Sequence, residues 1–271
     1  MKLPNHFIVA STENELVYHH SYEGLFKGHW RIPLKPLNFV GKSSNPVLRT
    51  KTQETQYDIS STTRRPLNLV LKFASKRKIK KEFENHLRLV EKIPTIHTLT
   101  PIGYSIHNEG GVLYTVLEKN AFPLRSFNFE QLSLEQRRKF LEQAAKTIAL
   151  LHASGITHND LKLKNTLYNV NDYRFYVTDL ARMNFSNGTR TNQAANYDLL
   201  TFIGDSLHKK LANNKQEIEE YFLKPYLEQL RIHYPEERKT QTPTQLLMEL
   251  INKTKQHPRD KVIQLVNRLN D

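Results

Sequence analysis

The sequence predicts an α+β fold in two parts: a strand-rich first part with one main helix, and a mostly helical second part. Three observations support this prediction. Segments rich in β-branched and aromatic residues prevail up to about residue 117, runs with helical periodicity prevail from residue 122, and a short hairpin pattern interrupts the helical part. We therefore expect two lobes, residues 1–118 and residues 119–271.

Strand patterns organise the first lobe. Residues 67–73 form an apolar strand that contains Lys72, and residues 112–118 form a second strand that ends at Glu118. The first 36 residues suggest an additional hairpin on this lobe. The pattern indicates no function for that hairpin.

One helix is expected in the first lobe, around residues 80–90. Its predicted apolar face, at helical spacing, consists of Phe83, Leu87 and Val90. Two acidic residues of this helix, Glu82 and Glu84, are candidates to pair with the strand lysine.

The second lobe begins with a helix over residues 135–152, which Gly155 ends. A hairpin follows, with strands at 166–169 and 174–178 and turn residues between them. The expected buried positions of the helix are Phe140, Leu141, Ala144, Ala145, Ile148 and Leu151. Further helices are expected at 216–231, where Pro225 should kink or split the helix, at 243–253 and at 259–269.

The chemistry of the chain is concentrated in residues 158–165, which read HNDLKLKN, and in Asp179, nineteen residues beyond Asp160. Phosphoryl transfer needs a positioned nucleophile and neutralised phosphate charge. Asp160 could orient the acceptor hydroxyl and accept its proton, and Lys162 could lie beside the transferred group. Asn165 and Asp179 offer the oxygen ligands that Mg²⁺ prefers.

These motifs resemble the protein-kinase-like superfamily, and within it the atypical lipopolysaccharide core kinases, the Kdo and heptose (WaaP-like) kinases. The resemblance rests on His-x-Asp-Leu-x-x-x-Asn, followed by the segment of residues 177–182, Val-x-Asp-Leu-Ala-Arg. It implies a bilobal kinase-like fold. Asp198, in the helix expected after residue 197, either anchors the loop that contains Asp160, as its counterpart does in related kinases, or caps its own helix.

The resemblance also implies a nucleotide site in the first lobe. Lys72 would contact the α- and β-phosphates of ATP, and the family's usual pattern favours Glu82 over Glu84 as its partner. Gly41 lies in the expected phosphate loop, which has only this one glycine over residues 39–47. Glu118 would lie at the hinge beside adenine.

The charge of the chain predicts an anionic partner. There are 40 basic and 27 acidic residues, giving a net charge of +13. The chain has no cysteine, so disulfides and thiolate metal sites are excluded. A phosphorylated glycolipid or an anionic membrane face fits this charge, whereas a specific nucleic-acid partner is disfavoured because no interleaved aromatic motif accompanies the basic clusters. With no apolar run of transmembrane length, we expect a cytoplasmic protein, with peripheral contact at the inner membrane face left open.

Three functions agree with these observations. The first is an ATP- and Mg²⁺-dependent kinase that phosphorylates a hydroxyl of a lipopolysaccharide core sugar. The second is an atypical Ser/Thr protein kinase, and the third is a pseudokinase scaffold, which the poor glycine loop suggests. The presence of Asp160, Asn165 and Asp179 weighs against the scaffold.

Overall fold

The computed structural model describes residues 7–11, 15–19, 47–58, 61–107, 110–118, 120–124, 127–186, 192–233 and 241–270. The chain divides into two compact units: Met1–Glu91 with Thr98–Lys119, and Lys92–His97 with Asn120–Asp271. The predicted α+β class is confirmed. Gly41 and nearly all of the expected phosphate loop lie outside the described residues, so the structure says nothing about them.

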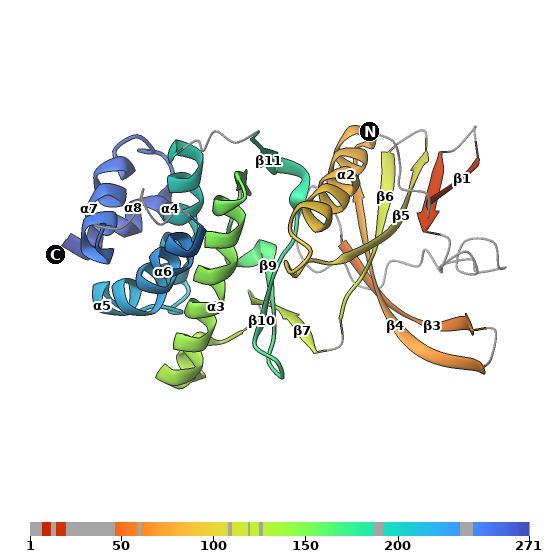
Figure 1. The fold of residues 1–271 in the computed structure, drawn as a ribbon, viewed down its shortest axis with the longest axis horizontal. Helices are drawn as coiled ribbons and strands as arrows, with labels where there is room; N and C mark the ends of the chain where they lie inside the picture. Colours follow the sequence, from red (N-terminus) through yellow and green to blue (C-terminus); the bar gives the residue numbers. More distant parts are fainter. Residues whose placement is uncertain are drawn as a thin grey trace. The chain divides into compact units, whose positions relative to one another are not determined.

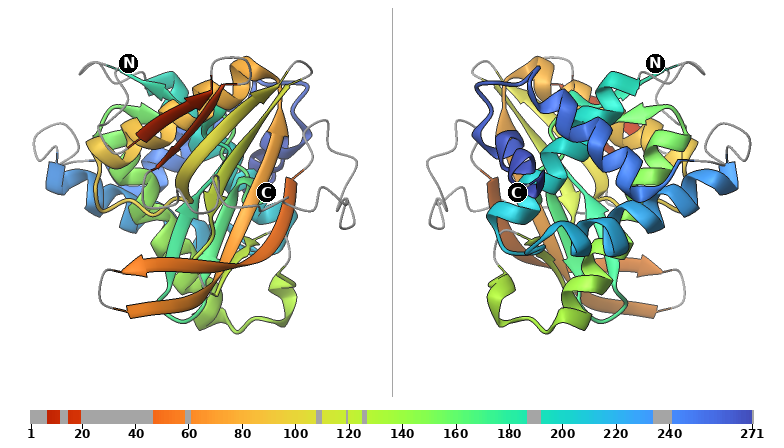
Figure 2. Two further views of the ribbon diagram at one scale, coloured as in Figure 1. Left: turned by 90° about the vertical axis from the view of Figure 1, so that its right-hand side faces the viewer. Right: turned by 90° about the vertical axis from the view of Figure 1, so that its left-hand side faces the viewer.

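An antiparallel sheet of six described strands forms the first unit, in the order β1-β2-β5-β6-β4-β3. Its strands are β1 (Phe7–Ser11), β2 (Leu16–His19), β3 (Val47–Asp58), β4 (Ser61–Ala74), β5 (Thr100–His107) and β6 (Gly110–Val116). Only residues 69–74 of β4 pair with β6, so β3 and β4 continue beyond it as a long hairpin (Figures 1 and 2).

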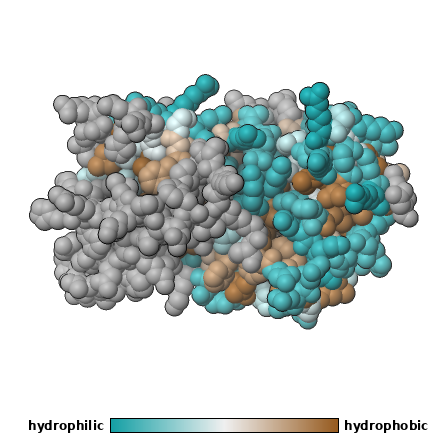
Figure 3. Space-filling model, turned by 180° about the vertical axis from the view of Figure 1, so that it is seen from behind, coloured by the Kyte–Doolittle hydropathy of each residue, from teal (hydrophilic) through white to brown (hydrophobic). Residues whose placement is uncertain are grey.

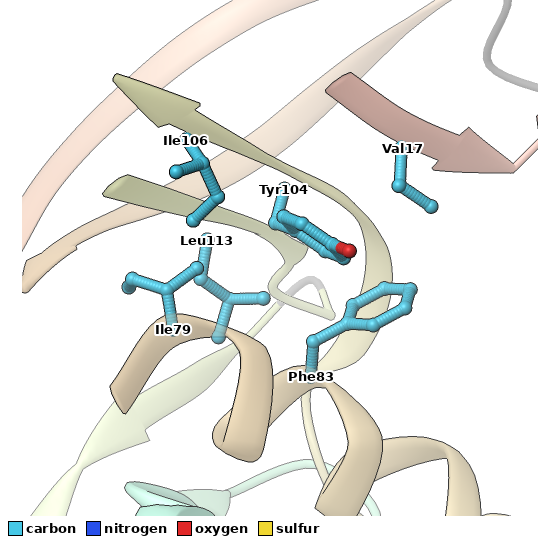
Figure 4. Close-up of a cluster of buried hydrophobic side chains, with 6 residues drawn as sticks. All are labelled: Val17, Ile79, Phe83, Tyr104, Ile106 and Leu113. Carbon is cyan, nitrogen blue, oxygen red and sulfur yellow. The ribbon is translucent and has the colours of Figure 1, made fainter. Parts of the chain in front are cut away.

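Helix α2 (Lys76–Lys92) packs on this sheet through the cluster drawn in Figure 4. The buried members are Val17, Ile79, Phe83, Tyr104, Ile106 and Leu113. The predicted apolar face of this helix is confirmed at Phe83, which is buried, and at Leu87, which packs against the cluster, but not at Val90, which is 42% exposed. The buried side of the helix also includes Leu89 and Ile79, and Ile79 lies one residue before the segment from which the face was predicted.

The N-terminal hairpin β1–β2 belongs to the same sheet, as the sequence suggested, because β2 pairs with β5. The contact is close at Gly103, where an added Cβ would lie 2.3 Å from the carbonyl oxygen of Val17. Glu15, just before β2, pairs with Lys80 of α2 and accepts a hydrogen bond from the hydroxyl of Tyr104. The hairpin is therefore joined to both the sheet and the helix.

In the second unit, α3 (Leu134–Ala153) starts at a capping box, in which Ser133 and Gln136 each bind the other's main-chain N–H. All six apolar positions predicted for this helix are buried. Next come β8 (Ile156–Thr157), which pairs with β11 (Asn184–Phe185), and the predicted hairpin of β9 (Thr166–Asn169) and β10 (Arg174–Val177), which β7 (Ala121–Pro123) extends.

Helices complete the second unit: α4 (Asn192–His208), α5 (Lys215–Ile218), α6 (Lys224–His233), α7 (Pro243–Thr254) and α8 (Lys261–Gln264). A π-helical turn over Glu219–Leu223 joins α5 to α6 directly before Pro225. Pro225 was expected to disturb the helix at this place, because a proline lacks an N–H and its ring clashes with the preceding turn. Among the residues that the structure describes, no helix is both long and apolar enough to cross a membrane.

Candidate active site

The loop of residues 158–165 lies between β8 and β9, and helix α4 holds its first residues. The buried carboxylate of Asp198 accepts the main-chain N–H of His158 at 2.7 Å and that of Asn159 at 2.8 Å, one on each oxygen. His152 of α3 lies 3.3 Å from the same carboxylate and 2.9 Å from the hydroxyl of Tyr226. Asp198 is the seventh residue of α4, so it anchors this loop and does not cap its helix.

A left-handed residue, Asn159 (φ 60°), turns the chain just before Asp160. Its side-chain amide donates to the carbonyl oxygen of Arg182 at 3.1 Å and to the hydroxyl of Thr157 at 3.2 Å. Asparagine tolerates this backbone conformation better than most residues. The turn therefore connects the 158–165 loop to the segment that follows Asp179.

Three hydrogen-bond contacts bring Asp160, Asn165 and the residue before Asp179 to one region of the second unit. The side-chain amide of Asn165 donates to the carbonyl oxygen of Asp160 at 2.8 Å, and the carbonyl oxygen of Asn165 accepts the N–H of Thr178 at 2.9 Å. The ring of His158 contacts the carbonyl oxygen of Thr178 through Nε2, at 2.9 Å. Residues separated by up to twenty positions are thus connected by three short contacts.

Asp179 itself adopts the left-handed conformation, with φ 57° and ψ 55°, directly after β10. Such a backbone is uncommon for a residue other than glycine and is concentrated at functional sites. The neighbouring Thr178 is held on both sides, by its N–H and by its carbonyl oxygen. The strained residue is therefore fixed by its surroundings.

The oxygen donors of this region suit Mg²⁺. Because the side-chain N–H of Asn165 donates to the carbonyl oxygen of Asp160, the amide oxygen of Asn165 is the atom that could bind a metal, and Asp179 adds a carboxylate. No group of three or more His, Cys, Asp or Glu side chains that could hold a metal lies within the described ranges. A Mg²⁺ ion bound by one amide and one carboxylate would need water and phosphate oxygens to complete its shell.

In the first unit, Lys72 of β4 is paired with Glu82 of α2. Its Nζ lies 2.8 Å and 2.7 Å from the two carboxylate oxygens, and the side chains are 12% and 2% exposed. Glu84 is exposed. The structure therefore selects Glu82 from the two candidates, because only Glu82 is on the side of α2 that faces the sheet.

The other predicted site residues lie as follows. Lys162 is half-buried, and its N–H donates to the carbonyl oxygen of Asp160 at 3.0 Å. Glu118 is exposed and follows the end of β6. Their roles toward a nucleotide stay predictions.

Two residues that sequence reasoning did not select adjoin the loop. Asp205 of α4 accepts the N–H of Leu163 at 2.7 Å, and Arg182 Nη1 lies 4.0 Å from Asp160 Oδ2. For Asp205, the available signal was its spacing from Asp198. Seven residues separate the two, which puts both on one side of a helix. Arg182 gave none beyond its place in the motif after Asp179.

Comparisons with known proteins bear on the family and the fold of the chain. Residues 74–222, more than half of the chain, match the lipopolysaccharide kinase (Kdo/WaaP) family. Among solved structures, the chain is similar to WaaP in complex with acyl carrier protein, with a TM-score of 0.50 and 17% identity, over 81% of this chain and 87% of that one. No curated protein matches the chain in sequence.

Proposed function

Because this chain belongs to the lipopolysaccharide kinase (Kdo/WaaP) family, and is therefore a kinase, we propose that it transfers the γ-phosphoryl group of ATP to a hydroxyl group of a lipopolysaccharide core sugar, with Mg²⁺ as the metal. The observation that carries this proposal is the bonded connection of Asp160, Asn165 and the residue before Asp179. One carboxylate for the acceptor and two oxygen ligands for a metal are what such a reaction requires.

In the proposed reaction, Asp160 orients the acceptor hydroxyl and takes its proton as the oxygen bonds to the γ-phosphorus. The bond from that phosphorus to the bridging oxygen breaks, and ADP leaves. Lys162 neutralises charge on the transferred group. Asn165 and Asp179 hold the metal, and bound Mg²⁺ neutralises charge on the phosphates.

We assign the nucleotide contacts to the first unit. Lys72 would bind the α- and β-phosphates, and the carboxylate of Glu82 would hold the lysine in place through the ion pair described above. Gly41 would contribute main-chain amides to the phosphates, and the main chain at Glu118 would bind adenine. The two lobes of residues 1–118 and 119–271 would thus bind nucleotide and carry the transfer residues, respectively.

An anionic acceptor is supported by the charges near Asp160. Arg182 is 69% exposed, and its guanidinium lies 4.0 Å from the carboxylate that would hold the acceptor hydroxyl. A phosphate or carboxylate group on the acceptor sugar would find the N–H donors of this guanidinium there. The net charge of +13 also favours an anionic acceptor and peripheral contact with an anionic membrane, at the inner face of the membrane.

Most described side chains on the face shown in Figure 3 are hydrophilic, with smaller hydrophobic patches between them. Such a surface suits reversible contact with lipid headgroups better than insertion. Sedimentation with vesicles, with and without anionic lipid, tests this part of the proposal. Equal binding to both vesicles would contradict it.

The decisive experiment is transfer of label from γ-labelled ATP to a lipopolysaccharide preparation, compared with a mixture of proteins. Label in the sugar core supports the proposed acceptor, whereas label in protein alone indicates a protein kinase. A thermal shift with ATP that requires Mg²⁺ separates both from a scaffold, since a ligand that binds the native state stabilises it. Absence of any shift at millimolar ATP would favour the scaffold.

Two variants separate the roles within the site. Asp160→Ala should abolish transfer while leaving the Mg²⁺-ATP thermal shift intact, because Asp160 acts on the acceptor. Asp179→Ala should instead weaken the Mg²⁺-dependent shift. Asp172→Ala is the matched control, since this aspartate lies in the β9–β10 turn and pairs with Arg174. An active Asp179→Ala variant would contradict the assigned metal ligand.

A further inference from the structure

Helix α4 binds the 158–165 loop at a second place, two turns beyond Asp198. We propose that Asp205 is a positioning residue, which holds the metal-binding half of this loop through the N–H of Leu163. The proposal rests on the proposed kinase activity and extends it. Asp205 touches neither nucleotide nor acceptor in this assignment.

The contact is short and buried. Asp205 Oδ2 lies 2.7 Å from the main-chain nitrogen of Leu163, and the two residues are 8% and 1% exposed. A hydrogen bond from an amide to a carboxylate is stronger than one between neutral groups. Without the carboxylate this amide would be a buried donor with no acceptor, which is unfavourable.

Leu163 is the first residue of a 3₁₀ turn that ends at Asn165. Within that turn the N–H of Asn165 donates to the carbonyl oxygen of Lys162 at 2.8 Å. Asn165 in turn binds the carbonyl oxygen of Asp160 through its side chain. A displacement of Leu163 would therefore also move the side-chain amide oxygen of Asn165, which is proposed to bind the metal.

The two aspartates of α4 bind the loop in different ways. Asp198 uses one oxygen for each of two main-chain amides, whereas Asp205 uses one oxygen for one amide. An asparagine has a single acceptor oxygen, and its NH₂ group cannot accept from an N–H. Asp205→Asn can keep its bond, but Asp198→Asn must lose one.

This difference gives the kinetic test. Asp205→Ala should lower kcat about 10- to 100-fold and raise the half-saturating Mg²⁺ concentration about 10-fold, with the KM for acceptor unchanged. Asp205→Asn should restore both values to near those of the wild type, whereas Asp198→Asn should stay impaired. Thr201→Val is the matched control on the same helix, because this buried hydroxyl binds only the carbonyl oxygen of Tyr197 in the described contacts.

Hydrogen exchange tests the contact without any acceptor. In Asp205→Ala the amide of Leu163 should exchange faster than in the wild type, and in Asp205→Asn at about the wild-type rate. Unchanged exchange, or faster exchange with unchanged kcat and Mg²⁺ dependence, would overturn the proposal. If Asp205→Ala does not fold, equal impairment of the two Asn variants would overturn it.

A wild type that transfers nothing to lipopolysaccharide sugars refutes the proposed acceptor, while the exchange rates and the Mg²⁺-dependent thermal shift still test Asp205.

Discussion

Gly204 of α4 lies against the main chain of α8. A glycine inside a helix destabilises it by about 1 kcal/mol relative to alanine, so helix propensity by itself would make Gly204→Ala stabilising. In the structure, a Cβ at this position would lie 2.1 Å from the carbonyl oxygen of Val262 and 2.8 Å from its carbonyl carbon. Both atoms belong to the main chain of α8, which cannot move aside as a side chain can.

The two effects can be compared in magnitude. Real Cβ atoms essentially never come within 3.0 Å of another heavy atom in this way, so α4 and α8 must separate by about 1 Å. Overpacking of this kind typically costs about 1 to 3 kcal/mol, and moving a whole helix belongs at the upper end. We therefore expect Gly204→Ala to be less stable than the wild type by about 1 to 2 kcal/mol, after the gain in helix propensity.

Urea unfolding of the wild type and the variant measures this difference from the midpoint, provided that the slope is unchanged. Ser206→Ala is the matched control. Its buried hydroxyl has no hydrogen-bond partner among the described residues, so its removal should be neutral or slightly stabilising. A Gly204→Ala variant at least as stable as the wild type would refute the inferred close approach of the two helices.

Three further predictions concern other parts of the chain. Asp198→Ala leaves the buried main-chain amide of His158 and the partly buried amide of Asn159 without this acceptor, and urea unfolding should show a loss of about 2 to 5 kcal/mol. Lys72→Met removes the buried ion pair that Lys72 makes with Glu82, and the same measurement should show a loss of about 3 to 5 kcal/mol. A change below about 1 kcal/mol would contradict the burial of the pair. Burial, then the hydrogen bond to Glu15, raises the pKa of Tyr104 above its ordinary value of 10.0. The folded state therefore holds this proton more tightly than the unfolded chain, so this contribution is present below about pH 10 and is lost as the pH rises further. Tyr104→Phe should lessen the alkaline loss of stability in urea titrations between about pH 8 and pH 11.

Local patterns determined much of the fold. The helix of residues 134–153 and the β9–β10 hairpin follow from periodicity and turn residues that lie next to one another in the chain. The order and spacing of Asp160, Asn165 and Asp179 likewise suggested phosphoryl transfer, because that chemistry needs those side chains whatever the surrounding fold. These inferences needed no knowledge of distant contacts.

Tertiary structure decided the rest. Glu82 and Glu84 are both acidic residues of one helix, and only the position of α2 on the sheet makes the first a partner of Lys72. Asp198 could have been a cap, and Asp205 had no predicted role, until α4 was placed beside a loop about forty residues earlier. Periodicity reports which side of a helix is buried, but which groups it meets there depends on packing between distant segments. That is why the sequence alone predicted candidate reacting groups, whereas only the folded chain decided which residues hold them in place.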